Sequence, residues 1–337
     1  FIRNYKTSIN EKLMEQRKFK PFGEVSALTL GGGGIGRIWG ESTREEAVQT
    51  VNLAIDKGIN HFDVAPMYGR GEAEKVIGEA IKGKDLGDLH FTTKCSLGIL
   101  PDHEVYDYLN SSLTRSLSSM GLERVDLFLL HSQLIEDDHQ LFRFNEFRNK
   151  NSTTLTSYFN AVIPAFEKLK KEGKIKSWGI GLGQEEALIK AMDHTNPPNA
   201  MQCIVNVLNS AGGIGYTTKD LNCNSILNEC QNRNIPILAI RAVQAGALTS
   251  SMDRKPHSSG HDKKDFEDFE KASLFRELAK NWGISPADLG HRYALSVPKV
   301  SSVILGVKNR IELEECLKSE EKKLTDQEII ELESLYF

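Results

Sequence analysis

The chain has 337 residues, of which 39% are hydrophobic and 26% charged, and its formal net charge is -4 with a pI of about 6.2. A globular chain of this length can bury a sizeable core, and its slight acidity argues against nucleic-acid binders and polybasic membrane-surface proteins. No apolar run approaches the roughly 20 residues that span a bilayer, and residues 1–20 are polar, without a signal-peptide core. We therefore expect a cytoplasmic protein whose partners are small molecules or proteins, not nucleic acid or membrane.

The cysteines are scattered and form no motif. No Cys-x-x-Cys pair and no Cys/His spacing of a zinc site is present, so we predict no metal site. Reduced thiols that act as small buried hydrophobic residues are the simplest expectation. The five are Cys95, Cys203, Cys223, Cys230 and Cys316.

The first strand expected, residues 25–30, runs into the glycine-rich residues 31–36. These satisfy the G-x-G-x-x-G pattern of a Rossmann nucleotide-binding fold, in which the helix begins within the glycines. Here the next helical pattern begins later, after a capping box in Ser42-Thr43-Arg44-Glu45. The glycines, with Gly33 and Gly34 among them, are therefore more typical of a loop whose backbone lies against a ligand.

Strand and helix patterns alternate along the rest of the chain, after a short hairpin expected at about residues 18–24. The further strand candidates are residues 58–64, 89–95, 125–131, 175–182, 200–207, 235–240 and 300–305. Helical patterns lie between them at about 43–57, 72–81, 105–119, 158–171, 185–191, 225–233 and 267–294. Two more helices are expected at 309–317 and 326–335, the last capped by Thr325.

Eight strands separated by helices predict a parallel sheet with right-handed crossovers. Without a break in composition, they favour one α/β domain over residues 1–337, a (β/α)8 TIM barrel with a polar extension at about residues 1–20. Long insertions at 132–157 and 249–265 follow the fourth and seventh strands, where a barrel builds its active site. Such loops are either functional or disordered, and we expect substrate loops at the C-terminal face.

Three polar residues close three of these apolar strands. Asp63 ends the second strand, Lys94 lies near the end of the third, and His131 ends the fourth. Tyr68 follows Asp63 by five residues, in a turn rich in Gly and Pro. A Lys or His in a barrel mouth is desolvated unless it is paired, so their joint occurrence predicts one shared polar cluster. Taken singly, each is also typical of a structural residue, such as a satisfied histidine or an aspartate that caps a turn.

The four side chains make a consistent set for proton transfer. A phenol with a pKa near 10 is a poor acid at neutral pH unless a cation lowers that pKa. Lys94 can do so while Asp63 holds the ammonium and His131 orients a substrate oxygen. No nucleophile elbow or metal-ligand set accompanies them, which leaves Tyr68 as proton donor to a carbonyl or acceptor from an alcohol. That transfer needs a hydride partner, which a nicotinamide can supply.

At this point the sequence resembles the aldo-keto reductase superfamily, from about residue 22 to residue 317. The matching segments are Asn60 to Gly69, Phe91 to Lys94, Asp126 to His131, Lys171 to Ile175 and Val303 to Gly306. The resemblance implies that Tyr68 is the general acid/base and that His131 positions the carbonyl. It also implies that Lys94 and Asp63 adjust the acidity of the phenol.

The resemblance also implies residues that contact the nicotinamide. Gln202 matches the glutamine that family members use on the carboxamide. The Ser-Asn pair usual after the fifth strand is replaced here by Gly183 and Gln184, and Gln184 keeps the amide chemistry with one more methylene.

For the phosphate groups, Arg241 to Leu248 resembles the pyrophosphate loop, with Arg241 where serine is usual. Lys308-Asn309-Arg310 resembles the segment that holds the adenosine 2'-phosphate, and its two cations favour NADP over NAD. Glu312 and Glu315 match an acidic pattern that follows, for which surface exposure is the alternative, and Cys316 stands where asparagine is common. The expected cofactor residues are Gly33, Gly34, Asp63, Gly183, Gln184, Gln202, Arg241, Gly246, Leu248, Gly306, Lys308, Arg310, Glu312, Glu315 and Cys316.

The segment from Ala65 to Gly71 resembles the branch of the superfamily that contains sugar and pyridoxal dehydrogenases. We therefore expect an NADP-dependent oxidoreductase, with NAD as the alternative cofactor, for a carbonyl of aldehyde, ketone, sugar or pyridoxal type and the corresponding alcohol. Arg70 either meets a polar or anionic substrate group or is a surface charge. The rival expectation is a regulatory subunit that binds a nicotinamide as a sensor, as channel-associated members of the family do.

Overall fold

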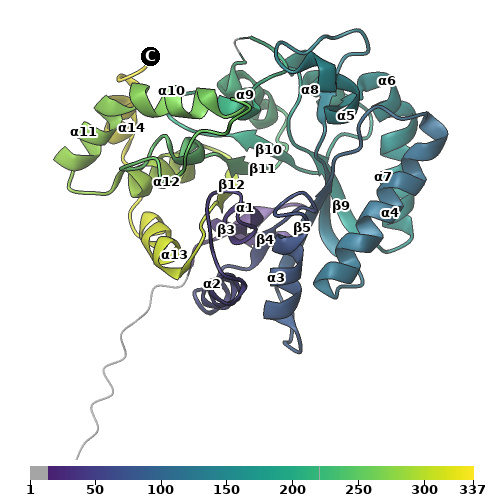
Figure 1. The fold of residues 1–337 in the computed structure, drawn as a ribbon, viewed down its shortest axis with the longest axis horizontal. Helices are drawn as coiled ribbons and strands as arrows, with labels where there is room; N and C mark the ends of the chain where they lie inside the picture. Colours follow the sequence, from purple (N-terminus) through teal and green to yellow (C-terminus); the bar gives the residue numbers. More distant parts are fainter. Residues whose placement is uncertain (1–13, 220) are drawn as a thin grey trace, which may run out of the picture.

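Eight parallel strands form a closed barrel at the centre of the computed structural model, which describes residues 14–219 and 221–337 (Figure 1). They pair in chain order, and the last strand pairs with the first. The strands are β3 (Leu28–Gly31), β4 (His61–Asp63), β5 (His90–Cys95), β6 (Val125–Leu130), β9 (Ile175–Ile180), β10 (Met201–Ile204), β11 (Ile237–Ile240) and β12 (Val300–Leu305). The predicted barrel and its eight strands are confirmed. The Rossmann alternative is wrong, because its sheet is open.

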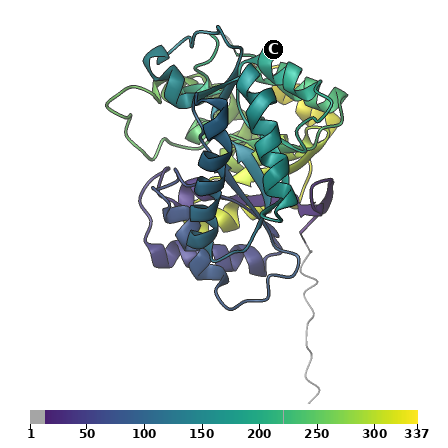
Figure 2. The ribbon, with the colours of Figure 1, turned by 90° about the vertical axis from the view of Figure 1, so that its right-hand side faces the viewer.

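A helix follows each barrel strand and packs outside the barrel. In Figure 1, α2, α3 and α13 lie along one edge of the molecule, and α4 and α7 run together along another, as Figure 2 also shows. Within the described residues, none of the helices has the length and hydropathy of a membrane span. In strand order the helices are α2 (Arg44–Asp56), α3 (Glu72–Ile81), α4 (Asp102–Met120), α7 (Ile163–Lys171), α8 (Glu185–Met192), α9 (Cys223–Asn232), α12 (Pro286–Ser296) and α13 (Arg310–Leu317).

The longer helical region expected at 267–294 consists of three helices. They are α10 (Lys263–Lys271), α11 (Ser273–Asn281) and α12. Gly283 has a φ of 69°, which ends the helical path. The hydroxyl of Ser285 then accepts a 3.1 Å hydrogen bond from the Asp288 N–H and caps α12. The closing helix, α14 (Asp326–Glu333), is capped by Thr325 as expected, and Thr325 forms a capping box with Glu328.

The glycine run after β3 also differs from the expectation. One helical turn, α1 (Gly32–Ile35), does begin within the glycines, and the main helix α2 follows later. The N-cap of α2 is Thr43, whose hydroxyl accepts a 3.1 Å bond from the Glu46 N–H. Ser42, expected to be the cap, donates instead to the Lys308 carbonyl at 2.9 Å. The N-cap of α2 is therefore one residue later than predicted, and the Glu46 carboxylate accepts from Arg310.

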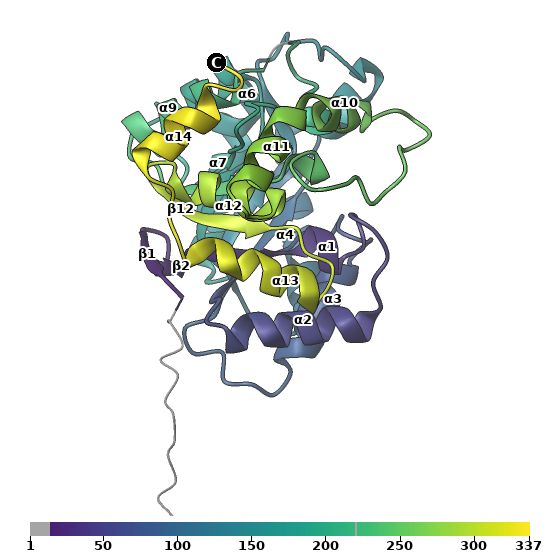
Figure 3. The same cartoon turned by 90° about the vertical axis from the view of Figure 1, so that its left-hand side faces the viewer.

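A hairpin closes the N-terminal end of the barrel, at the end opposite α1 (Figure 3). It consists of β1 (Gln16–Phe19) and β2 (Gly23–Ser26), which pair antiparallel as expected. Phe19 and Val25 are fully buried and pack on the barrel residues Leu127, Leu129 and Leu238. Residues 16–19 of the expected polar extension therefore belong to the fold, and residues 1–13 lie outside the described residues.

The two insertions lie at the C-terminal ends of the strands. The first contains a small parallel sheet of β7 (Gln133–Ile135) and β8 (Ser152–Thr154), and Leu134 bridges to Gly183 after β9. The short helices α5 (Arg148–Asn151) and α6 (Leu155–Ser157) flank β8. The second insertion is an irregular loop that leads into α10 and projects beside it (Figure 3). All five cysteines are buried free thiols, as expected.

Candidate active site

Lys94 is the centre of the polar cluster at the barrel mouth. The strand β4 ends at Asp63, and the neighbouring strand β5 carries Lys94 one residue before its end, so both side chains enter the mouth together. Nζ of Lys94 donates to Asp63 Oδ1, to the Val64 carbonyl at 3.0 Å and to the Tyr68 hydroxyl at 3.2 Å. The ammonium is fully buried and has three acceptors, which is the number of its protons.

Tyr68 and His131 complete the cluster. Their rings meet edge to face, with centroids 5.8 Å apart and an interplanar angle of 83°. The turn that carries Tyr68 packs closely on α1, because a Cβ at Gly32 would lie only 3.0 Å from Cδ2 of the tyrosine. His131 directly follows β6, and its backbone N–H donates to the Cys95 carbonyl at 2.8 Å. The structure thus brings together all four residues predicted to form one cluster.

Burial and charge act on these groups in opposite directions. Burial raises the pKa of Asp63, and Lys94 opposes this effect. Burial lowers the pKa of Lys94, but Asp63 and Tyr68 together outweigh this effect, with Asp63 the larger contributor, and the net pKa is raised. Burial raises the pKa of Tyr68 above 10, and Lys94 only partly offsets it. The expected lowering of the phenol pKa by Lys94 is therefore present as one contribution and is not the net result.

His131 is a neutral imidazole at physiological pH. Burial, together with the charge of Lys94, lowers its pKa to about 3. A neutral imidazole carries one N–H and can donate a hydrogen bond without releasing a full positive charge into the site.

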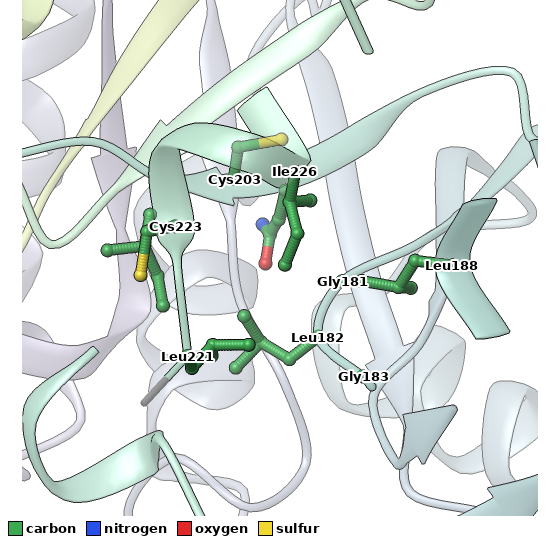
Figure 4. A pocket seen from close by; sticks show the side chains of 10 residues that line it. Gly181, Leu182, Gly183, Leu188, Cys203, Leu221, Cys223 and Ile226 are labelled. Atoms are coloured by element: carbon green, nitrogen blue, oxygen red, sulfur yellow. The ribbon is translucent and has the colours of Figure 1, made fainter. Parts of the chain in front are cut away.

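Gln202 connects the cluster to a narrow pocket. Its Nε2 donates to Asp63 Oδ2 at 2.7 Å, and the side chain lines a pocket at the ends of β9 and β10. Gly183 lines the same pocket, together with Gly181 and Cys203 (Figure 4). Two of the expected nicotinamide residues, Gln202 and Gly183, are therefore neighbours. Gln184 is placed differently, because its Oε1 accepts a 3.0 Å bond from the Glu136 N–H in the first insertion.

The expected glycines mark a close approach between the ends of β3 and β12. A Cβ at Gly34 would collide with the carbonyl of Val307. At Gly33 and Gly306 a Cβ would meet the indole of Trp39, which lies 3.0 Å from the Cβ position of Gly306. These glycines let the two backbones and the indole lie together, and Gly306 itself stays exposed. Trp39 was not expected in this place.

The two cations expected at the 2'-phosphate are both paired with carboxylates. Lys308 Nζ forms ion pairs with Asp253, from the second insertion, and with Glu312 at 2.9 Å. Glu312 also accepts a 2.8 Å bond from the Lys308 backbone N–H. Arg310 pairs with Glu46 of α2 at 2.9 Å. Arg310 is the first residue of α13 and Lys308 precedes it by two residues, and both have carboxylates beside them.

The other expected cofactor residues are placed as follows. Leu248 is fully buried in the core, so only its backbone is available for a ligand. Gly246 has a φ of 96°, which a residue with a side chain rarely adopts. Cys316 is buried, and burial raises the pKa of its thiol, whereas Glu315 is half-buried. The guanidinium of Arg241 pairs with an acidic residue of α10, and its backbone carbonyl lies in the loop after β11.

Sequence reasoning missed one buried contact beside the cluster. Thr93, next to Lys94, donates a 2.7 Å hydrogen bond to Oε1 of Glu74, which is 2% exposed. Burial raises the pKa of Glu74, and the Thr93 bond opposes this effect. The bond ties α3, which begins just after the Tyr68 turn, to the strand that carries Lys94. The available signal was a carboxylate beside Ala73 on the apolar face of a predicted helix.

The closed (β/α)8 barrel and the buried titratable cluster at its mouth define a barrel protein of the enzyme type, since barrel enzymes place their active sites at this face. The chain belongs to the aldo/keto reductase family, whose model matches residues 27–336, and is an NAD(P)-dependent oxidoreductase. This confirms the resemblance drawn from the sequence.

Similar proteins include sugar and pyridoxal dehydrogenases, as the sequence around Tyr68 predicted. The L-galactose dehydrogenase of Arabidopsis thaliana is 26% identical over 298 residues, which cover 87% of this chain and 83% of the relative. The D-threo-aldose 1-dehydrogenase of Pseudomonas sp is 23% identical, with 84% and 85% covered. The pyridoxal 4-dehydrogenase of Microbacterium luteolum is 22% identical, with 90% and 92% covered.

Solved structures share the fold over nearly the whole chain. An aldo-keto reductase from Bacillus halodurans in its holo form has a TM-score of 0.71 at 19% identity, with 96% of each chain covered. An aldo-keto reductase from Klebsiella pneumoniae in complex with NADPH has a TM-score of 0.65 at 21% identity, again with 96% of each chain covered. Both support the barrel.

Proposed function

We propose that this chain is an NADP(H)-dependent enzyme that interconverts a small carbonyl compound and its alcohol, with Tyr68 as the general acid/base. The observation that carries the proposal is the 3.2 Å hydrogen bond from Lys94 to the Tyr68 hydroxyl, held by Asp63 and placed beside His131. A protonated phenol, a fixed cation and a neutral imidazole converge where a substrate oxygen would be bound.

The nicotinamide, when bound, supplies or accepts the hydride at the substrate carbon. Tyr68 handles the proton on the substrate oxygen. Its raised pKa keeps the phenol protonated at neutral pH, so it can donate in the direction of reduction. Lys94 then stabilises the phenolate that remains, because its ammonium is already hydrogen-bonded to that oxygen. In the direction of oxidation, the phenolate takes the proton from the alcohol.

His131 positions the substrate oxygen in this proposal. With a pKa of about 3 its imidazole stays neutral and does not compete with Tyr68 as an acid. The edge-to-face contact of the two rings keeps the imidazole beside the phenol. One oxygen can therefore accept hydrogen bonds from both groups, which fixes its orientation before proton transfer.

The residues present fit an NADP molecule. Gln202 is hydrogen-bonded to Asp63 at the barrel mouth, and Gly306, at the end of β12, leaves its backbone exposed. Lys308 and Arg310 offer two cations at the start of α13, and the related Klebsiella pneumoniae structure holds NADPH. Their present carboxylate partners would have to be exchanged for the 2'-phosphate.

For the substrate we propose a polar aldehyde, ketone, free sugar or pyridoxal-type compound, since the similar proteins include dehydrogenases of sugars and of pyridoxal. Met67 and Arg70, which flank Tyr68, are exposed at the same turn, where a substrate would first make contact. A turnover screen of aldehydes, pyridoxal and free sugars, with NADP and NAD in both directions, would identify the class.

Tyr68→Phe tests the assigned role. Loss of the phenolic proton should lower kcat by about 10²–10⁴-fold, the usual contribution of general acid/base catalysis. The affinity for NADP+ should stay close to that of the unchanged protein, as measured by fluorescence titration. Tyr106→Phe, at a tyrosine bonded to Glu172 away from the site, is the matched control. Turnover retained in the Tyr68 variant would remove Tyr68 from the mechanism.

A further inference from the structure

The loop after β11, residues 241–248, has backbone φ angles that most of its residue types rarely adopt. Arg241, Gln244 and Ala245 have φ angles of 58°, 45° and 50°, and Gly246 follows with 96°. The left-handed region is unfavourable for residues with a side chain, so such a loop persists only where surrounding contacts hold it. The contacts of these residues therefore decide whether the loop keeps its shape.

Helix α10 supplies these contacts through two buried carboxylates. Asp265, 3% exposed, forms an ion pair with the guanidinium of Arg241. Asp268, 2% exposed, accepts a 2.8 Å hydrogen bond from Nε2 of Gln244. Nε of Arg241 also donates to Oε1 of Gln244 at 2.8 Å. The side chains of two strained residues are therefore joined to each other and fixed to α10.

Arg254, from the second insertion, extends the network to the third strained residue. Its Nη1 donates to the Ala245 carbonyl at 2.7 Å, and its Nη2 donates to Asp265 Oδ2 at 3.0 Å. Asp265 thus lies between two guanidinium groups. Burial lowers the pKa of Arg241, and the charge of Asp265 opposes this effect, so the carboxylate keeps the buried cation charged.

The loop after β10 closes the network from the other side. The Gly213 N–H donates to Asp265 Oδ1 at 2.9 Å, and the Ser210 hydroxyl donates to Asp268 Oδ2 at 2.5 Å. Gly212 has a φ of 53°, and a Cβ there would collide with the Asp265 carboxylate and the Gln244 amide. Only glycine lets this loop approach α10 closely enough for both bonds.

We propose that Asp265 is a positioning residue for the cofactor, which holds residues 241–248 in the shape that binds the cofactor's pyrophosphate. In this proposal Arg241 is the internal partner of Asp265 and not a direct phosphate ligand. The inference rests on the proposed function, which assigns the loop to the cofactor. Turns built with left-handed residues can direct backbone N–H groups towards one anion, so the shape of this loop matters more than the charge on Arg241.

The substitution Asp265→Asn distinguishes positioning of the loop by Asp265 from direct phosphate binding by Arg241. It keeps the size of the side chain and removes the charge that holds Arg241. If Asp265 positions the loop, the Kd for NADP+ should rise about tenfold or more, while kcat at saturating cofactor and the substrate KM stay within about twofold. If Arg241 binds the phosphates itself, its release from Asp265 would leave the Kd unchanged or lower. That result would overturn the proposal.

Gly212→Ala disturbs the same carboxylate from the opposite side and should raise the Kd in the same way. Asp288→Asn, which removes a buried acid from an ion pair in α12, is the control and should leave the Kd unchanged. Ser210→Ala removes the bond to Asp268 and the 3.1 Å bond that the hydroxyl accepts from the Gly212 N–H. It leaves both buried carboxylates charged, so it gives a milder variant, with a smaller rise, should Asp265→Asn fail to fold. An unchanged Kd in both Gly212→Ala and Ser210→Ala would count against the proposal.

Amide hydrogen exchange on the cofactor-free protein supplies a readout that does not depend on turnover. In Asp265→Asn, exchange should accelerate in residues 241–248 and stay unchanged in residues 63–68. Equal exchange in the variant and the unchanged protein would refute the inference. Failure of the unchanged protein to bind NADP+ would refute the proposed function instead, and the exchange data would still decide whether Asp265 holds the loop.

Discussion

Asp63→Asn should lower the pKa of Lys94, which is raised in the unchanged protein, and should thereby change how the free energy of unfolding depends on pH. In the unchanged protein Asp63 and Tyr68 together outweigh burial and raise the pKa of Lys94, so the stability that Lys94 contributes is present below pH 10.5 and is lost only above it. With a neutral amide at position 63, the larger of these two contributions is lost and burial dominates. The pKa of Lys94 should then fall below 10.5, by up to about 3 units for a fully buried amine.

The expected free energies follow from that shift. Each pKa unit corresponds to about 1.4 kcal/mol, so Asp63→Asn should cost about 4 kcal/mol at pH 7, within the range for removing one partner of a buried pair. Between the lowered pKa and pH 10.5 the native state binds fewer protons than the unfolded state, so the stability of the variant rises with pH. The difference from the unchanged protein should therefore shrink by up to about 1.4 kcal/mol per pH unit.

Urea unfolding at pH 7, 8, 9 and 10 measures this difference. Asp288→Asn is the matched control, because its partner is Arg292, joined by bonds of 2.8 and 2.7 Å, and an arginine stays charged throughout this range. Its cost should be constant with pH. A cost for Asp63→Asn that is equally constant would show that Asp63 does not control the protonation of Lys94, and the assignment of the cluster would fail.

Three further predictions concern cofactor choice, positioning and acid stability. Lys308→Ala with Arg310→Ala should raise the Kd for NADP+ about tenfold more than that for NAD+ in fluorescence titrations, and equal losses would contradict the 2'-phosphate assignment. Thr93→Val removes the bond from Thr93 to the buried Glu74 carboxyl and should cost about 1–3 kcal/mol in urea unfolding. It should also lower kcat, because this bond joins α3 to the strand that carries Lys94, and Thr93→Ser should restore both. His61 is buried with a pKa of about 3, so the unfolded state gains the proton first as pH falls below 6.5. About 2 kcal/mol of stability should be lost between pH 7 and pH 5. His61→Asn has no imidazole to protonate and should not show this loss, so an equal loss in the variant would refute the prediction.

The polar cluster at the barrel mouth could be predicted because it lies on consecutive strands. Parallel barrel strands are buried on both faces and read as apolar runs, so a polar residue that closes such a run is visible in the sequence. Asp63, Lys94 and His131 each close one run, and adjacent parallel strands place their ends side by side. Local pattern and topology were sufficient to bring these three residues together.

The placement of the expected cofactor residues could not be predicted in the same detail, because it depends on ion pairs between residues that no periodic pattern connects. Lys308 pairs with Asp253 and Arg310 with Glu46, partners 55 and 264 residues away in the chain. A sequence shows these residues as separate surface charges. The conformation of residues 241–248 likewise depends on a carboxylate of α10, and its left-handed residues carry no compositional signal at Arg241 or Ala245.

The pKa of Tyr68 shows which electrostatic effects can be predicted from a sequence and which cannot. Lys94 lowers the pKa of the phenol as expected, but burial, which depends on the assembled barrel, acts more strongly in the other direction. In the proposed mechanism both effects serve reduction of a carbonyl. Burial would keep the proton on Tyr68 until an oxygen accepts it, and Lys94 would stabilise the phenolate once the proton has moved. Since Asp63 keeps Lys94 charged, a carboxylate that is hydrogen-bonded to Lys94 and Gln202 determines how well Tyr68 can act as an acid.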